Sequence, residues 1–343
     1  DSGQALHEIM TRERPYVKLA KYIAECDEEV THADLVEDLP FFKGSDANRK
    51  EMLRLATAWG YKNNIIIQRS YMEGIEFLRG ESLKVTDLNQ MILSYSDHMA
   101  YNYQNETAPF AELQTLTQEP GLHWVNHHFN NGHRTEEEAL SGFNMVVLDI
   151  DGECTLQAAQ LLLERYTYHI YTTKRHTPEE NRFRVIIPTN YVLQLDAKDY
   201  AEFMKNIYEY FPLGAAADSQ TGQRARKWLT HQGNYFYHEG ELLDVLPFIP
   251  KTSKNDEYKR QLSDLAHLDN LERCFLENTG LGNRSNQLVK YALLLVDMGA
   301  SASEVDEKVK SLNAKMADKL SDKEIDSTIM ITAAKAIVKR DNA

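Results

Sequence analysis

The alternation of apolar and polar positions is most informative in residues 143–151, Phe-Asn-Met-Val-Val-Leu-Asp-Ile-Asp. Four apolar residues run directly into Asp149, and Asp151 follows after one further apolar position. A short apolar run rich in β-branched residues predicts a buried strand. Because side chains alternate along a strand, the two aspartates share one face with Met145 and Val147. The pattern therefore predicts a buried strand that ends in two carboxylates on the same side.

The neighbouring segments predict further helices and strands. Apolar residues recur at helical spacing in residues 155–165 and 197–210. Strands are predicted at residues 168–173, 182–188, 228–230 and 234–237. Before the acidic strand, residues 88–98 are predicted to form a helix, capped by Thr86 or Asp87. Residues 101–120 are polar and contain two prolines, which predicts irregular structure.

The first 82 residues predict helices followed by a ribbon. The helices are expected at residues 5–28, 33–39 and 48–59. Thr31 would cap the second helix, and Gly60 would end the third. Two strand-like runs follow, residues 64–68 and 74–78. Three helices and then a two-stranded ribbon is the order of a winged helix-turn-helix.

This N-terminal segment has two possible functions. In the first, Arg49, Lys50 and Arg54 on the third helix face the phosphates of a DNA duplex. In the second, the segment is a small helical packing or protein-contact module. Its acidic residues favour the second: Glu28, Glu29, Asp34, Glu37, Asp38 and Asp46.

The chain beyond residue 250 is predicted to be helical after a polar linker. The helices are expected at residues 257–277, 285–298, 303–317 and 323–339. The glycine-containing stretch 280–286 lacks the Gly-Lys-Ser/Thr of a phosphate-binding loop and has no strand before it. The sequence therefore predicts an α+β chain with a mixed-sheet domain, residues 83–250, between two helical domains, residues 1–82 and 251–343.

Composition and charge narrow the classes of function. The chain has 343 residues, of which 42 % are hydrophobic, and three scattered cysteines. No apolar run approaches the ~18–20 residues that span a bilayer, so we expect a soluble protein without a membrane partner. The cysteine number predicts a reducing compartment and excludes a cysteine-based zinc site. The net charge of −14 argues against nonspecific binding of nucleic acid by the whole surface of the protein. Any nucleic acid would have to bind in a local basic groove.

The acidic pair predicts a metal site. Carboxylates about 7 Å apart on one strand repel each other and are costly to desolvate. A divalent cation that bridges Asp149 and Asp151 would remove both costs. The alternative is a pair of strand-end carboxylates that cap nearby backbone amides.

A cluster of cations follows the acidic pair. Five cationic or cationisable residues lie within eleven positions: Lys174, Arg175, His176, Arg182 and Arg184. Such a concentration suits a triphosphate, whose oxygens arginine grips in bidentate fashion and lysine or histidine as point donors. The alternative is a solvated hairpin in which Glu179 and Glu180 balance the charge.

Other polar residues of the middle segment are candidates of different strength. Asp218 follows small residues and precedes Arg226. It is a candidate because it would add a third carboxylate to the acidic pair. His127, His128 and His133 are close in sequence, but no carboxylate or cysteine stands at ligand spacing, which disfavours a metal site. Arg134, after an Asn-Gly turn, is a better candidate for a phosphate contact.

Residues from about 84 to 250 resemble the catalytic domain of archaeo-eukaryotic-type primases, the primase–polymerase superfamily, in the form carried by phages and plasmids. The matching pieces are Asn131-Gly-His-Arg134, Val146-Val-Leu-Asp-Ile-Asp151, Tyr171-Thr-Thr-Lys-Arg-His176, Arg182-Phe-Arg-Val-Ile-Ile-Pro188 and Asp218 with Arg226. Lys174 stands where the family usually has serine. The resemblance implies a primase–polymerase catalytic domain flanked by a winged-helix-like domain and a helical primase C-terminal domain.

The resemblance also implies roles for single residues. Asp149, Asp151 and Asp218 would hold two Mg²⁺ or Mn²⁺ ions, and the nucleotide contacts would be His176, Arg182, Arg184 and Arg226. The implied activity is nucleotidyl transfer that makes primers on a single-stranded DNA template from nucleoside triphosphates, either NTP or dNTP. A separate helicase is an expected partner, and the expected location is the cytoplasm of a bacterial host cell.

Two alternatives remain open. Leu148-Asp-Ile-Asp-Gly152 also fits the start of haloacid-dehalogenase-type phosphatases, in which Asp149 would be the nucleophile and Thr172 or Thr173 part of the second motif. No acidic motif of that family follows Asp218. The other alternative is a non-catalytic replication protein that binds DNA through its N-terminal helices.

Overall fold

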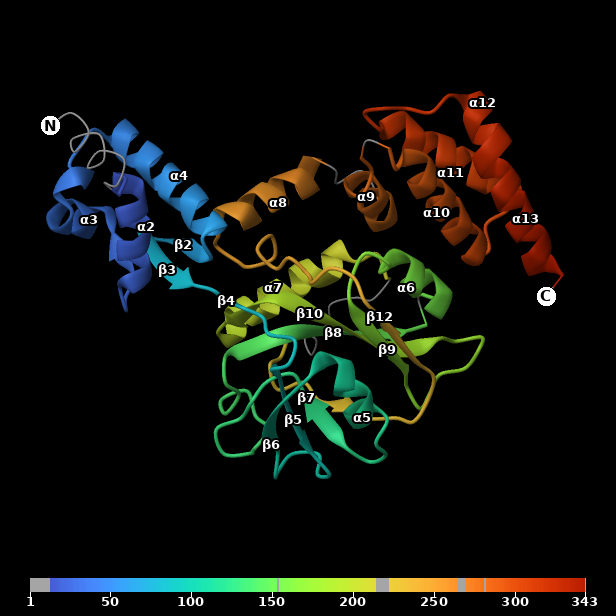
Figure 1. Cartoon of the computed structure of the whole chain (residues 1–343), viewed down its shortest axis with the longest axis horizontal. Coiled ribbons are helices and arrows are strands. Elements are labelled where there is room, and N and C mark those ends of the chain that lie inside the picture. The colour runs from blue at the N-terminus through green and yellow to red at the C-terminus, as the bar shows by residue number, and fades with distance from the viewer. Residues whose placement is uncertain (1–12, 153, 214–221, 265–268, 281, 343) are drawn as a thin grey trace, which may run out of the picture. The chain divides into compact units, whose positions relative to one another are not determined.

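The structure is a computed structural model that describes residues 13–152, 154–213, 222–264, 269–280 and 282–342 (Figure 1). The chain divides into two compact units. Unit 1 comprises residues 1–87, 190–194 and 244–261, and unit 2 comprises residues 88–189, 195–243 and 262–343. The predicted α+β class is confirmed by helices and antiparallel sheets. The division into three domains stays a prediction.

Unit 1 contains helices and a hairpin in the predicted order. Its elements are α2 (Pro15–Glu25), β1 (Val30–Thr31), α3 (His32–Asp38), a 3₁₀-helix (Pro40–Phe42), α4 (Asp46–Lys62), β2 (Ile65–Met72) and β3 (Ile75–Ser82). The strands form an antiparallel sheet in the order β1-β3-β2. Thr31 caps α3 as predicted, since its side chain accepts a hydrogen bond from the amide of Asp34. Leu19, Leu35 and Leu53 bring the helices into one buried core with this sheet.

The helix predicted to end at Gly60 continues to Lys62. The reason for a glycine at this position is packing, because a Cβ atom at Gly60 would lie 2.9 Å from the carbonyl oxygen of Ile65. Helix α4 and strand β2 therefore approach each other so closely at Gly60 that a side chain at this position would not fit.

Two of the cations on α4 are paired within the helix. Arg54 donates to both carboxylate oxygens of Glu51, at 2.8 and 2.7 Å, and Arg49 is paired with Asp46. These ion pairs neutralise positive charge that would be needed on this helix to contact the phosphates of a duplex. The winged-helix and duplex-binding interpretation stays a prediction.

Unit 2 is built around the sheet that contains the acidic strand. Its strands are β8 (Gly142–Asp151), β9 (Tyr168–Thr172), β10 (Arg182–Gln194) and β12 (Tyr235–His238), and helices α6 (Leu156–Leu162) and α7 (Ala197–Tyr210) accompany them. Strand β9 lies between β12 and β10 with antiparallel pairing on both sides, and β8 pairs with β10. β10 extends beyond its predicted end at residue 188. Its residues 190–194 belong to unit 1 and pair there with β4 (Lys84–Val85).

A second antiparallel sheet of unit 2 contains segments that were predicted wrongly. Its order is β11-β7-β5-β6, formed by β11 (Trp228–Leu229), β7 (His123–Val125), β5 (Met91–Ser96) and β6 (Gln104–Ala108). The predicted helix at residues 88–98 is β5, and the predicted irregular segment contains β6, a 3₁₀-helix (Phe110–Glu112) and α5 (Leu113–Thr117). Met91 and Leu93 are buried at alternate positions, and the buried hydroxyl of Ser94 donates to the carbonyl of His127 at 2.8 Å. Such contacts favour a strand at a position where the local pattern was ambiguous.

The C-terminal part of the chain is helical, as predicted. Its elements are α8 (Ser253–Asp264), α9 (Asn270–Glu277), α10 (Arg284–Asp297), α11 (Ala302–Lys315), α12 (Asp322–Glu324), a π-helix (Ile325–Ile329) and α13 (Met330–Asp341). The prediction of a single helix at residues 257–277 is wrong. The backbone of Asp269 is extended and its side chain caps the start of a separate helix, α9. Leu288, Val309 and Ile329 share a core with Ala158 of α6. None of the helices in the described ranges combines the length and the apolar character that crossing a bilayer requires.

Candidate active site

Strand β8 carries both predicted acids to the edge of a cavity. Met145 and Val147, which precede the acids on the same face, are buried in a cluster with Trp124 and Trp228. The chain leaves this apolar cluster at Asp149, whose side chain is 17 % exposed, and the side chain of Asp151 is 58 % exposed. The predicted alternation along this strand therefore holds, and it places one carboxylate deeper than the other.

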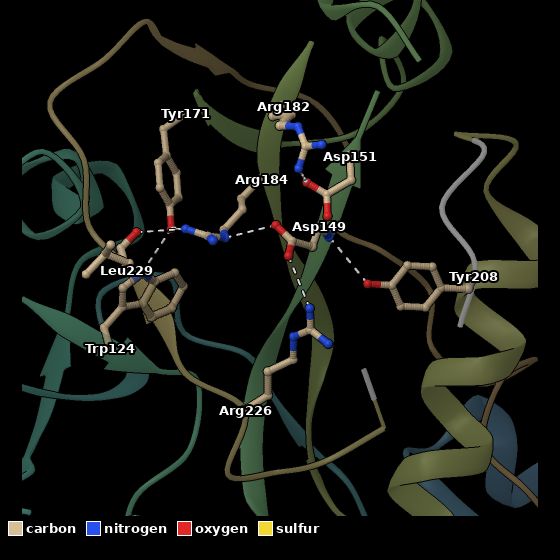
Figure 2. A network of polar contacts seen from close by, with 9 residues as sticks. All are labelled: Trp124, Asp149, Asp151, Tyr171, Arg182, Arg184, Tyr208, Arg226 and Leu229. Atoms are coloured by element: carbon tan, nitrogen blue, oxygen red, sulfur yellow. Dashed lines mark hydrogen bonds and ion pairs between the residues drawn. The ribbon is translucent and has the colours of Figure 1, made fainter. Parts of the chain in front are cut away.

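Asp149 lies between two arginines that come from separate segments (Figure 2). Arg184 of β10 donates from Nε to Oδ1 at 3.0 Å, and Arg226, two residues before β11, donates from Nη2 to Oδ2 at 3.1 Å. Both arginine side chains are less than a fifth exposed, at 14 % and 17 %. Charge-assisted bonds between such poorly solvated groups are stronger than those at a surface.

Aromatic rings hold the two arginines in place. The guanidinium of Arg184 lies 5.5 Å from the ring of Trp228, and that of Arg226 lies 4.8 Å from the same ring. Arg184 also donates from Nη1 to the carbonyl of Leu229 at 2.7 Å and to the hydroxyl of Tyr171 at 3.3 Å. Burial works against the charged form of Arg184, but Tyr171 and Asp149 outweigh it and raise the pKa of the guanidinium.

Asp151 has its own arginine. Arg182 donates from Nη1 to Asp151 at 3.0 Å and from Nη2 to Glu180 at 2.7 Å, and the hydrogen bond to Glu180 raises the pKa of Arg182. The backbone amide of Arg182 donates to Nδ1 of His176 at 3.1 Å. With Nδ1 accepting, a neutral His176 ring carries its proton on Nε2, where it can donate to a ligand.

Four of these residues, Asp149, Asp151, Arg182 and Arg184, line a cavity of about 380 Å³, whereas Arg226 and His176 are not part of its lining. Its lining residues are Asp149, Asp151, Thr173, Lys174, Arg175, Arg182, Arg184, Leu229 and His231. The lining contains four permanent cations and two carboxylates. The cavity therefore has an acidic floor and a basic surround, an arrangement suited to a polyanion that is bound together with divalent cations.

Of the remaining predicted site residues, one lies outside the described part of the chain and one makes backbone contacts. Asp218 falls in residues 214–221, outside the described part of the chain, so its meeting with Asp149 stays a prediction. Arg134 donates from Nε to the carbonyl of Met99 at 2.9 Å and from Nη1 to that of Ala225 at 2.6 Å. It therefore supports the segment that carries Arg226, and its predicted phosphate contact stays a prediction.

The three clustered histidines lie in different environments. His127 is buried against the rings of Phe143 and Tyr200, His128 bonds through Nε2 to the carbonyl of Glu106 at 2.9 Å, and His133 stacks on Tyr101. Among the residues with described positions, no group of three or more histidine, cysteine, aspartate or glutamate side chains is placed to hold a metal ion. The preference against a histidine metal site stays a prediction.

The acidic pair still has the chemistry that a hard cation requires. Each carboxylate oxygen has two lone pairs, so both aspartates can bind a cation while they keep their arginine bonds. Oxygen ligands are those that Mg²⁺ and Mn²⁺ prefer. The described residues thus fit two of the three predicted ligands.

Sequence reasoning missed Trp228, Tyr171 and His231 as parts of this site. Trp228 stands two residues after Arg226, and strand-like alternation would have suggested a shared face. His231 lies two residues after β11 and lines the cavity. Its position depends on the pairing of β11 with β7, which no local pattern predicts.

Comparisons with known proteins add little to this geometry. No protein-family model matches the chain, and no curated protein matches it. The solved crystal structure of primase RepB' is similar with a TM-score of 0.26 and 11 % sequence identity, over 74 % of this chain and 94 % of that chain. A likeness at this level carries no argument about function, so the functional conclusion rests on the residues of the site.

Proposed function

We propose that this chain is a DNA-dependent primase–polymerase that makes primers on single-stranded DNA by two-metal nucleotidyl transfer in phage or plasmid replication. The observation that supports this most is the position of Asp149 between Arg184 and Arg226, beside the pair of Asp151 and Arg182. Acids that bind cations and arginines that bind phosphates meet there in one cavity.

The residues have distinct roles in the proposed reaction. Asp149, Asp151 and Asp218 would hold two Mg²⁺ or Mn²⁺ ions. When bound, the ions supply activation of the attacking 3′-hydroxyl and neutralise charge on the triphosphate and the leaving pyrophosphate. The chain itself fixes both carboxylates through arginine bonds, so their oxygens are oriented before a substrate arrives.

The basic surround would bind the nucleoside triphosphate. Lys174 and the arginines of the lining offer donors to phosphate oxygens, and His176 would add an Nε2–H donor. Donors fixed by Trp228 and Tyr171 cost little reorganisation as negative charge moves to the leaving group. The binding of NTP or dNTP and the partnership with a separate helicase are parts of the same proposal.

The phosphatase alternative is less well supported by the site. That alternative assigns no role to the arginines paired with Asp149 and Asp151. A non-catalytic DNA-binding protein would have no use for the acidic floor of the cavity.

The test is strand synthesis on single-stranded DNA with labelled nucleotides and Mg²⁺ or Mn²⁺. We expect product from the wild-type chain and a loss of at least ~10³-fold in rate for Asp149→Asn and for Asp151→Asn. Glu119→Gln, which changes an exposed acid, is the matched control and should remain active. Synthesis by Asp149→Asn at the wild-type rate would refute the proposal, and hydrolysis of p-nitrophenyl phosphate that depends on Asp149 would favour the phosphatase.

A further inference from the structure

Three rings form an exposed stack at the surface of unit 2. The ring of Tyr101 lies 4.6 Å from that of His133 at an interplanar angle of 16°, and 5.3 Å from that of His98 at 38°. Tyr101 is 53 % exposed and the adjacent Met99 is 58 % exposed. Rings gathered at the surface in this way offer planar faces to a further aromatic group.

The backbone under these rings is well fixed. Nδ1 of His98 accepts hydrogen bonds from the amides of Ala100 and Tyr101, each at 3.1 Å, and the hydroxyl of Ser96 donates to the carbonyl of Tyr101 at 2.7 Å. Gly132 has a φ of +64°, and a Cβ atom there would lie 2.9 Å from the carbonyl oxygen of Tyr103. The rings are therefore presented by a preformed loop, which reduces the entropy lost when a ligand stacks on them.

Hydrogen bonds connect this ring stack to the acidic site. Arg134 follows His133 and joins the carbonyl of Met99 to that of Ala225. Glu136 accepts from Nε of Arg224 at 2.8 Å and from the amide of Ala225 at 3.2 Å. The next residue, Arg226, bonds to Asp149. The loop that carries the rings thus holds the segment that completes the site.

Lys227 follows Arg226 in the sequence and has His123 beside it. Nζ of Lys227 lies 3.4 Å from Nδ1 of His123. Burial, followed by the charges of Arg134 and Arg184, lowers the pKa of Lys227. Burial, followed by Lys227, Arg134 and His98, lowers the pKa of His123. The charges of Lys227, Arg134 and Arg184 are near enough to repel one another, and we call these three cations the row, whereas the lowered pKa of His123 favours its neutral form.

The acids near this row leave its charge largely in place. Glu136 is paired with Arg224, and Glu138 accepts from the side-chain amide of Asn131 at 3.0 Å. Asp97, next to His98, is exposed to solvent, which screens it. In a chain of net charge −14, a row of cations beside exposed rings is a local exception that calls for an anionic, aromatic ligand.

We propose that the stack of His98, Tyr101 and His133 is a platform on which a base of single-stranded DNA stacks as the strand passes to the site of Asp149. Every base has a π face that can stack on an aromatic ring, and the phosphates of the strand would meet the row that contains Lys227. In a duplex the base faces are already stacked on one another, so a single strand is the form that fits. The path of the strand rests on the proposed function, whereas binding itself requires no catalysis.

The test is fluorescence anisotropy with a labelled oligothymidylate strand, in EDTA and without nucleotides. We expect Tyr101→Ala to raise the Kd about tenfold and Tyr101→Phe to keep it within about twofold of the wild type. Tyr71→Ala is the matched control, because Tyr71 is another exposed tyrosine, 69 % accessible, on β2 of unit 1. It should leave the Kd unchanged.

The outcomes separate this inference from the proposed function. Wild-type affinity in Tyr101→Ala, an equal loss in Tyr71→Ala, or tighter binding of a duplex or of an RNA strand of matching sequence would overturn the platform. If Tyr101→Ala lowers the melting temperature, His133→Ala carries the same test. Synthesis by Asp149→Asn at the wild-type rate would refute the proposed function without affecting the platform.

Discussion

One tryptophan ring and one carboxylate are shared by the same two arginines at the candidate site. Trp228 is 4 % exposed and has the guanidiniums of Arg184 and Arg226 near its ring, while Asp149 bonds both. A ring quadrupole offsets part of the repulsion between two buried cations without adding a charge that would compete for metal. The site can thus keep two positive charges close together for a phosphate.

The planar fork of Arg184 is expected to be essential. Arg184→Lys keeps the charge but loses the separate donors that reach Asp149, Leu229 and Tyr171. We expect kcat/KM for the nucleotide to fall about tenfold or more in the strand-synthesis assay. Arg165→Lys, in an exposed ion pair with Glu241, is the control and should match the wild type. Full activity of Arg184→Lys would show that only the charge at this position matters.

A buried histidine should make the fold sensitive to acid. His127 is fully buried, and burial, followed by Arg224 and His128, lowers its pKa to about 3. Its folded-state pKa is below the unfolded value of about 6.5, so its contribution to stability is full above that pH and is lost as pH falls. Between pH 6.5 and 5 the loss should be about 2 kcal/mol. Urea unfolding at both pH values should show this loss, and His127→Leu should reduce the pH dependence by this amount, while the buried His169, whose pKa burial lowers to about 4, keeps its own share.

At the scale of elements, success depended on whether the local pattern and the tertiary contacts agree. Residues 143–151 and 197–210 were predicted well, because their apolar periodicity matches the faces that the fold buries. Residues 88–98 were predicted wrongly as a helix. The run Met91-Ile-Leu93 fits the apolar period of a helix and that of a strand, and pairing with β6 and β7 selects the strand. The basic residues Lys174, Arg182 and Arg184 were found from their concentration within a short stretch of the sequence. The contact of Arg226 with the ring of Trp228 depends on the pairing of β11 with β7, which the sequence does not reveal.

The contact of α2 with β3 predicts a stability defect. A Cβ atom on Gly80 would lie 2.5 Å from the backbone nitrogen of Ala24 and 2.6 Å from its Cα atom. Gly80→Ala must therefore push α2 away from the sheet, at a cost of about 1–3 kcal/mol. Gly44→Ala, whose nearest neighbour would be the Cβ of Asn48 at 3.4 Å, is the control. Equal free energies of unfolding for the two variants would contradict this account of the packing.

At the scale of the whole molecule, the distribution of charge matters more than its sum. The chain has 38 lysines and arginines against 52 aspartates and glutamates. The cations of the cavity and Lys227 nevertheless all belong to unit 2. Nucleic acid should therefore bind there and be repelled by most of the remaining surface.

The salt dependence of DNA binding should reflect this limited basic area. If three or four phosphates are neutralised, the logarithm of the association constant for a single strand should fall with the logarithm of salt concentration with a slope of about −2 to −3. Anisotropy titrations over a range of salt concentrations measure this slope. A slope steeper than about −6 would indicate a far larger basic surface than the cavity and its margin provide.

The bonds of Asp149 also have a consequence for local opening. One carboxylate joins β8, β10 and the chain before β11, which are far apart in the sequence. None of these segments can fray alone without leaving a desolvated ion without its counter-ion, which is costly. Their amide protons should therefore exchange with solvent in a single cooperative event, and a substitution of this acid should loosen all three segments together.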